Sequence, residues 1–280
     1  AQSRERACRE DTGIMIKLIE QERELDRELL LKTLSGRKML AYMKAYGAGY
    51  EFCRFYKITD ETGVGFMFII NSTLIICGDG NLGATEEIDL FVSMNLPFRI
   101  EGDQKILKGI KLQERYQELN RTVFELVADC GPLKATEAHV NLDPNLPEVY
   151  RILSEGFPNI SDFSLWYTDT SHRCRHGISR VFTYRDSTTA SAVFDIENVV
   201  LIGQVATDTA ARGRGYAREF LRWLARFFNN LGKRAYLLAL DVRVSFYREI
   251  GFREVETEIV LERIDVEKES TKKGRLADEQ

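Results

Sequence analysis

Two arginines and two glycines alternate in the short segment Arg212-Gly213-Arg214-Gly215, which follows an apolar run and precedes an amphipathic helical pattern. The N-terminus of a helix presents unpaired backbone N–H groups and the positive end of the helix dipole, so it attracts anions. Glycines let a phosphate approach the backbone, and arginines add charge-assisted hydrogen bonds. The segment therefore predicts a binding site for a diphosphate group.

The spacing of these residues separates the segment from other phosphate-binding motifs. A Walker loop needs GxxxxGK[ST], and no Lys-Ser or Lys-Thr pair follows here. A dinucleotide fingerprint needs a third glycine, which is missing after Gly213-x-Gly215. An RNA-binding arginine-glycine tract would be longer and would lack the helical pattern that follows, with apolar residues at Ala217, Phe220, Leu221, Leu224, Phe227, Phe228 and Leu231.

Two motifs together resemble the GNAT superfamily of N-acetyltransferases. The residues from Arg212 to Ala217, placed after Val205-Ala206-Thr207, match its [Q/R]xxGx[G/A] acyl-coenzyme A motif. The segment Ser245 to Phe252 is similar to the FYxxxGF segment of the same family. The close resemblance covers about Leu146 to Arg263, and it implies transfer of an acetyl group from acetyl-CoA, as cosubstrate and without a metal, to a primary amine in a ternary complex.

The resemblance also implies which residues hold the cosubstrate. The strand that ends at Thr207 would diverge from the strand at 234–240 and pair with the pantetheine arm, while the arginine-glycine loop would hold the pyrophosphate. The cosubstrate-binding residues implied in this way are Val205, Ala206, Thr207, Arg212, Gly213, Arg214, Gly215, Tyr216 and Ala217.

Tyr247 is the candidate catalytic acid that the FYxxxGF segment supplies. A phenol with a pKa near ~10 is protonated at neutral pH and can deliver a proton to the departing thiolate; the alternative is that Tyr247 only packs beneath its helix. The general base stays unassigned, because Leu201 stands where some relatives carry glutamate. Asp195 and Glu197 share the side of Leu201 by strand parity but are expected to be solvated turn residues. A water molecule, or an acceptor that arrives neutral, is equally compatible.

Departures from the family pattern leave a second function open. Relatives often carry Asn and Ala ahead of the tyrosine, whereas this chain has Leu240-Asp241-Val242-Arg243. The alternative is therefore a non-catalytic acyl-CoA-binding regulatory protein. For an enzyme, the acceptor is a small-molecule or peptide amine: polyamine, aminoglycoside, amino acid and protein N-terminus all fit. The sequence leaves a homodimer open.

Two further segments invite a functional interpretation. His172-Arg173-Cys174-Arg175-His176 does not suit a metal, because its ligands would span ~13 Å on a strand, and Cys174 would point away from both histidines on a helix. A wall of the acceptor site or a plain exposed segment is favoured instead. Trp166-Tyr167-Thr168-Asp169 lies where the family often forms its acceptor pocket, although an aromatic pair is more often core.

The elements that must position these residues follow from the hydrophobic patterns. In the second half we expect a helix at 146–157, strands at 179–185, 191–196 and 199–207, the helix after Gly213, a strand at 234–240, a short helix at 244–250 and a strand at 253–264. In the first half we expect one or two surface helices within 13–46, strands at 52–58, 64–70 and 72–78, a helix at 84–94 and a strand at 96–102.

A shift of 126 residues aligns the two halves without a gap, placing Arg54 on Arg180 and Phe68 on Phe194. The repeat predicts an α/β (α+β) fold of two GNAT-like domains, each a mixed, mostly antiparallel sheet flanked by helices. We predict a helical segment plus degenerate GNAT-like domain over 1–135, a catalytic domain over 136–265 and a flexible charged tail over 266–280. The degenerate half carries acids at Asp79, Glu86 and Glu87 where the other half has arginines, so we expect it not to hold coenzyme A.

The composition sets limits on partners and location. A formal net charge of −4 over 280 residues argues against general nucleic-acid binding. No run approaches the ~20 apolar residues that span a bilayer, and no secretory signal pattern is present, so we expect a cytoplasmic protein without membrane association. The five cysteines, Cys8, Cys53, Cys77, Cys130 and Cys174, are scattered and odd in number, which disfavours a disulfide framework.

Overall fold

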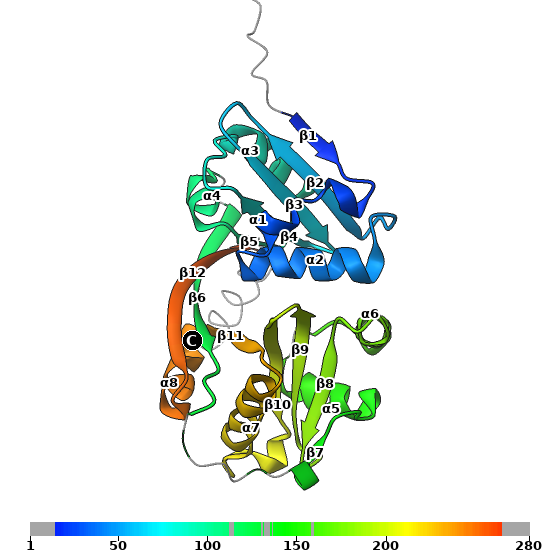
Figure 1. Ribbon diagram of the computed structural model, residues 1–280, viewed down its shortest axis with the longest axis vertical. Coiled ribbons are helices and arrows are strands. Elements are labelled where there is room, and N and C mark those ends of the chain that lie inside the picture. Colours follow the sequence, from blue (N-terminus) through cyan, green and yellow to red (C-terminus); the bar gives the residue numbers. More distant parts are fainter. Residues whose placement is uncertain are drawn as a thin grey trace, which may run out of the picture. The chain divides into compact units, whose positions relative to one another are not determined.

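The computed structural model describes residues 15–111, 115–129, 131, 135, 137–157 and 160–264 (Figure 1). The chain forms two compact units that are not contiguous in sequence. The first unit contains the residues up to Leu30, Ala48–Glu118 and the residues from Leu261. The second contains Leu31–Gly47 and Leu119–Val260. The predicted tail at 266–280 lies outside the described residues.

The first unit is built on an antiparallel meander that continues into one parallel strand. β1, β2, β3 and β4 pair antiparallel in that order, and β5 pairs parallel with β4 after the crossover helix α3. The strands are β1 (Met15–Leu18), β2 (Cys53–Thr59), β3 (Val64–Ile70), β4 (Thr73–Gly78) and β5 (Arg99–Gly102). The helices are η1 (Glu22–Glu24), α1 (Arg27–Leu30), α3 (Thr85–Asn95) and α4 (Gln104–Gly109).

The second unit repeats this order of elements. β8, β9 and β10 form an antiparallel meander, and β11 pairs parallel with β10 after the crossover helix α7. The strands are β6 (Tyr116–Glu125), β7 (Val140–Asn141), β8 (Arg180–Tyr184), β9 (Thr188–Ile196), β10 (Val199–Thr207), β11 (Arg234–Leu240) and β12 (Arg253–Arg263). The helices are α2 (Leu34–Tyr46), η3 (Glu137–His139), α5 (Leu146–Gly156), α6 (Phe163–Arg175), η4 (Thr209–Ala211), α7 (Tyr216–Asn230) and α8 (Asp241–Ile250).

Helices cover both faces of the sheet in the second unit. The apolar side of α7, including Phe220, Leu224 and Phe228, packs on Val200 and Ile202 of β10. The alternate residues of β10 face the other side, because successive side chains of a strand point to opposite faces. There Leu201 packs with Ala41 and Ala45 of α2. Ala206 packs with α5 and α6 on the same side, because the strand register shifts between Gly203 and Ala206. β10 is therefore buried on both faces.

The closing strand of each unit comes from a distant part of the chain. In the second unit, residues 121–125 of β6 pair antiparallel with β11. In the first unit, Leu261 and Glu262 of β12 pair antiparallel with Ile100 and Arg99 of β5. Each sheet is thus completed by a strand that lies far from it in sequence.

The predicted α/β class with mostly antiparallel sheets is confirmed, and the predicted strands of both meanders are present. The expectation for 13–46 is wrong in part, because Met15–Leu18 pairs with β2 as a strand and most of α2 is buried rather than at the surface. The predicted domains divide the chain once, near 135, whereas the compact units assign α2 and most of β6 to the second unit. None of the described helices is long and apolar enough to cross a membrane.

Candidate functional site

The parallel strands β10 and β11 separate at their carboxyl ends. Their pairing runs from Val199 with Arg234 to Ile202 with Leu237, although the strands continue to Thr207 and Leu240. The last residues of β10 keep their partners on the other side, where Thr207 pairs with Thr188 of β9. This pattern confirms the predicted divergence. The separated edge of β10 offers backbone N–H and C=O groups to a ligand that extends along it.

A bulge in β10 marks the start of the separation. The register with β9 shifts between Gly203 and Ala206, and Gln204 adopts a left-handed φ of 51°. Ser191 donates a hydrogen bond of 2.9 Å from its hydroxyl to the side-chain oxygen of Gln204, which holds this conformation. A Cβ at Gly203 would lie 2.8 Å from a methyl carbon of Val193, so a larger residue there would force the Val193 side chain to move. Bulges bend a strand and redirect its hydrogen-bonding groups.

The arginine-glycine loop is exposed and leads into α7. Gly213 and Gly215 both adopt left-handed conformations, with φ of 77° and 80°. Gly215 is the N-cap, so α7 begins at Tyr216 rather than at Gly213, and no side chain caps it within the described chain. A Cβ at either glycine would meet no atom within 4 Å, so the loop is open on its outer side. The first amides of α7 are therefore available to an anion.

The two loop arginines bond only to carbonyl oxygens among the contacts that the structure shows. Arg212 donates from Nε to the carbonyl of Thr207 at 3.1 Å and from a terminal nitrogen to the carbonyl of Glu155 at 3.3 Å. Arg214 donates to the carbonyl of Ala210 at 3.3 Å. Carbonyls orient a guanidinium without removing its charge. Both arginines thus keep positive charge at the mouth of α7.

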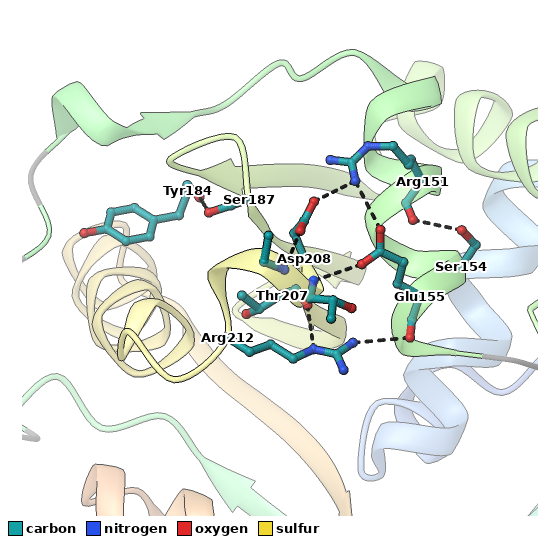
Figure 2. A network of polar contacts seen from close by, with 10 residues as sticks. Arg151, Ser154, Glu155, Tyr184, Ser187, Thr207, Asp208 and Arg212 are labelled. Carbon is teal, nitrogen blue, oxygen red and sulfur yellow. Dashed lines mark hydrogen bonds and ion pairs between the residues drawn. The ribbon is translucent and has the colours of Figure 1, made fainter.

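A carboxylate network fixes the connection that precedes the loop (Figure 2). Arg151 of α5 donates to Asp208 at 2.6 Å and to Glu155 at 3.2 Å. Asp208 also accepts the backbone N–H of Ala210, and Glu155 accepts that of Thr209. These hydrogen bonds hold the pKa of both carboxyls below their usual values, that of Asp208 mainly through Arg151 and that of Glu155 mainly through Thr209. The network attaches the end of α5 to the end of β10.

Tyr247 lies in α8 and is buried, with 9% of its surface exposed. Its ring centre is 5.5 Å from that of Phe124 in β6, and Val205 of β10 packs against the same apolar cluster. Burial raises the pKa of the phenol, and the nearby charge of Arg243 opposes this rise only in part. The group is therefore fully protonated at neutral pH, as a proton donor must be.

The carboxylates considered for the base lie at the wrong end of β10. Asp195 accepts a hydrogen bond of 2.6 Å from Lys233, so it belongs to an ion pair and is not the solvated residue that was expected. Glu197 occupies the exposed β9–β10 turn with φ of 54°. Both stand beside Val199, where β10 begins, whereas the separation from β11 lies at its other end. Leu201 is buried against α2.

The segment from His172 to His176 closes helix α6 and is packed against α2. Arg173 is 6% exposed and forms an ion pair of 2.6 Å with Asp169, which also accepts a hydrogen bond from Tyr46. His172 stacks on Tyr46 and donates from Nε2 to a backbone carbonyl of α2 at 2.8 Å. The described residues contain no group of three potential metal ligands. The segment is therefore not a plain exposed one, and its buried members anchor α2.

Trp166, considered for the acceptor pocket, is only 4% exposed and packs with Ile152 and Leu153 of α5. Tyr167 is 41% exposed.

The sequence analysis did not predict the bulge at Gln204 or the hydrogen bonds that Asp208 accepts from Ala210 and Arg151. The second had a local signal, because Asp before a short turn of helix is a preferred N-cap.

Comparison with known proteins identifies the domain that contains this site. The model of the acetyltransferase (GNAT) family matches residues 146–252, from the start of α5 to the end of the FYxxxGF segment. Residues 146–252 form a GNAT acetyltransferase domain. A search of curated protein sequences gave no match.

Solved structures, two of the following three being of GNAT or GCN5-related acetyltransferases, resemble most of the chain at low sequence identity. A GNAT-family acetyltransferase from Colwellia psychrerythraea aligns with a TM-score of 0.56 and 13% identity, covering 90% of this chain and 100% of its own. A GCN5-related N-acetyltransferase from Sphaerobacter thermophilus gives 0.55 and 14%, covering 91% and 98%. A Drosophila protein gives 0.62 and 10%, covering 90% and 99%. These likenesses concern the fold, and their coverage extends the GNAT fold into the first unit.

Proposed function

We propose that the second unit is an N-acetyltransferase that transfers the acetyl group of acetyl-CoA to a primary amine by direct attack in a ternary complex. The observation that carries the proposal is the end of the β10–β11 pairing at Ile202 and Leu237, immediately before the exposed loop and the uncapped start of α7. An open strand edge that leads to an anion-binding helix terminus suits an extended ligand that ends in a diphosphate.

The residues present fit the parts of acetyl-CoA in order. The first amides of α7, with Arg212 and Arg214, would bind the diphosphate. The free edge of Val205, Ala206 and Thr207 would pair with the amides of the pantetheine arm. Gly213 and Gly215 leave open space where a side chain would obstruct the phosphates. The proposal assigns no metal.

The chemistry needs one proton donor and a polarising backbone. The nitrogen of a neutral amine attacks the thioester carbonyl carbon, and backbone N–H groups of the β10 edge stabilise the oxyanion that forms. The C–S bond then breaks, the amine loses its proton to water, and the thiolate takes a proton from the hydroxyl of Tyr247, which regains a proton from water. The products are the N-acetylated amine and coenzyme A. The acceptor is a small-molecule or peptide amine.

The test is release of coenzyme A from acetyl-CoA over a panel of polyamines, aminoglycosides, amino acids and peptide N-termini, with a titration of coenzyme A by calorimetry. We expect binding together with turnover of at least one amine. Binding without turnover of any amine would favour the alternative of a non-catalytic acyl-CoA-binding protein. Absence of binding would reject the site itself.

A further inference from the structure

A third arginine, Arg185, stands at the turn between β8 and β9. The connection consists of Arg185, Asp186 and Ser187, and the N–H of Ser187 donates to the carbonyl of Tyr184 at 3.2 Å. The two central residues of the turn closed by this bond, Arg185 and Asp186, both adopt left-handed φ, 52° and 47°. Hairpin turns with two left-handed central residues favour Asn and Gly, because larger side chains are strained there. Strained residues that a structure retains are concentrated at functional sites. The left-handed backbone of Arg185 therefore suggests that its side chain has a function.

The guanidinium of Arg185 is held in one orientation by three groups. Its central carbon lies 5.4 Å from the ring centre of Tyr184 and 5.4 Å from that of Tyr216. Its Nε donates a hydrogen bond of 3.1 Å to the hydroxyl of Tyr184. That hydroxyl donates in turn to Glu219 at 2.8 Å, so its oxygen is free to accept from Arg185. The arrangement orders the side chain before any ligand arrives.

The guanidinium lies at the same end of α7 as the arginine-glycine loop. Tyr216, which it contacts, is the first residue of α7 and follows Gly215 directly. The turn is also attached to the end of β10, because the carbonyl of Ser187 accepts the N–H of Asp208 at 2.7 Å. Arg185 therefore lies at the end of α7 that Arg212 and Arg214 precede in sequence, and Glu219 of α7 is an acid whose charge acts on Arg185.

The outer side of the guanidinium is open. Arg185 is exposed, and the hydrogen bond that the structure shows for its side chain uses Nε alone. Among the described residues, no hydrogen-bond partner is found for its terminal nitrogens, so both are available to a ligand. A planar guanidinium with two parallel N–H donors matches two oxygens of a phosphate.

We propose that Arg185 binds the 3′-phosphate of coenzyme A, which makes it a specificity-determining residue; the inference rests on the proposed function. Coenzyme A carries three phosphates, and the amides of α7 with Arg212 and Arg214 serve the two of the diphosphate. The 3′-phosphate is a monoester with up to two charges, attached through the adjacent ribose. An ordered arginine beside the same helix turn provides the donors that this third phosphate requires.

The test compares coenzyme A with 3′-dephospho-coenzyme A by calorimetric titration of the full chain. We expect the unmodified protein to bind coenzyme A about tenfold more tightly, the scale of one charge-assisted contact. Arg185→Gln should lose this preference while binding the dephospho compound within twofold of the unmodified protein. The matched control is Arg180→Gln, because Arg180 of β8 also stacks on two rings, those of Phe182 and Phe227, but toward the other end of α7.

Each outcome decides the assignment. Loss of the preference in Arg185→Gln, with its retention in Arg180→Gln, supports it. An unchanged preference in Arg185→Gln overturns it, and so does equal weakening for both compounds, which would place Arg185 on the diphosphate. If the unmodified protein binds neither compound, the proposed function fails as well, and this result differs from a failure of the Arg185 assignment alone.

Discussion

The connections that follow β4 and β10 occupy the same position in the two units, but their backbone amides have different partners. After β10, the loop is exposed and no side chain caps α7 within the described chain. After β4, two carboxylates of the protein accept hydrogen bonds from the backbone amides of the loop. Asp79 accepts the N–H groups of Asn81 at 2.9 Å and Leu82 at 3.2 Å, and Asp60 accepts that of Gly83 at 2.7 Å.

The difference shows how a phosphate loop can be converted into a structural one. The carboxylates of Asp60 and Asp79 accept hydrogen bonds from the amides that a diphosphate would need. They also add negative charge where the other loop has arginines. Leu82 is buried at 5% exposure and fills the space over Gly65. The loop after β4 is therefore filled by a side chain, and the amides of Asn81, Leu82 and Gly83 already have acceptors. The expectation that the first unit does not hold coenzyme A gains support from these contacts and stays a prediction.

The largest effect is expected from closing the open loop. Gly215→Glu places a carboxylate and a strained left-handed side chain at the start of α7, and we expect the affinity for coenzyme A to fall by about a hundredfold or more. Calorimetric titration measures the loss. Gly80→Glu is the matched control, because Gly80 has a similar φ of 85° and similarly open space in the loop after β4. Equal losses in both variants would contradict the contrast between the loops.

The next effect concerns Tyr247 of the second unit, the proposed proton donor. Tyr247→Phe keeps the ring in its cluster and removes the hydroxyl, so we expect kcat to fall by about 10²-fold while the affinity for coenzyme A changes less than twofold. Steady-state rates and titration measure the two quantities. An unchanged kcat would show that Tyr247 only packs in the core.

The pH dependence of kcat provides a second test of the role of Tyr247. An acid works only while protonated, so its contribution is lost as the pH rises through its pKa. Because burial raises the pKa of Tyr247 above its ordinary value near ~10, we expect no decline of kcat attributable to it up to about pH 10. A basic limb near pH 8 in the unmodified protein that persists in Tyr247→Phe would assign that limb to another group.

The loop after β4 should respond to acid through Asp60. Burial alone would raise the pKa of Asp60, but hydrogen bonds from Thr62, Gly83 and Gly63 outweigh it and lower the pKa to about 2. A depressed pKa stabilises the fold above the unfolded pKa of ~3.9, and this stability is lost as the pH falls toward 2. We expect Asp60→Asn to flatten the decrease in the free energy of unfolding between about pH 4 and pH 2, measured by urea titration.

The smallest effect is expected at the network that supports the open loop. Arg151→Gln removes an ion pair whose arginine side chain is 53% exposed, and such pairs contribute at most about 1 kcal/mol. We expect a decrease of this size or less in the free energy of unfolding, with the affinity for coenzyme A within threefold. Thermal unfolding with titration checks both. A tenfold loss of affinity would show that the network positions the loop.

Local patterns predicted much of the fold and the core of the candidate site. The alternation and length of the apolar runs indicated both meanders, and the Arg212–Ala217 loop and Tyr247 were named from motifs alone. Helix α6 was not predicted, because its buried side includes Thr170 and Arg173 and so shows no apolar stripe. The hydrogen bond of Asp60 with the amide of Gly83 was not predicted either, because a partner 23 residues away leaves no periodic signal.

Strand β6 and the position of α2 in the second unit were not predicted, for a related reason. β6 carries Gln117, Glu118 and Asn120 among its apolar residues, and what makes it a strand is its antiparallel match to β11, more than a hundred residues later. α2 is buried because β9 and α6 supply a surface for it. Neither surface is visible in the segment itself.

Because the closing strands are exchanged along the chain, no single cut divides this protein into its two units. A cut near residue 135 would leave α2 and β6 on one fragment and the strands that they complete on the other. The same cut would separate β5 from β12, which pair through Ile100 and Leu261. Neither fragment would contain all the elements of one unit.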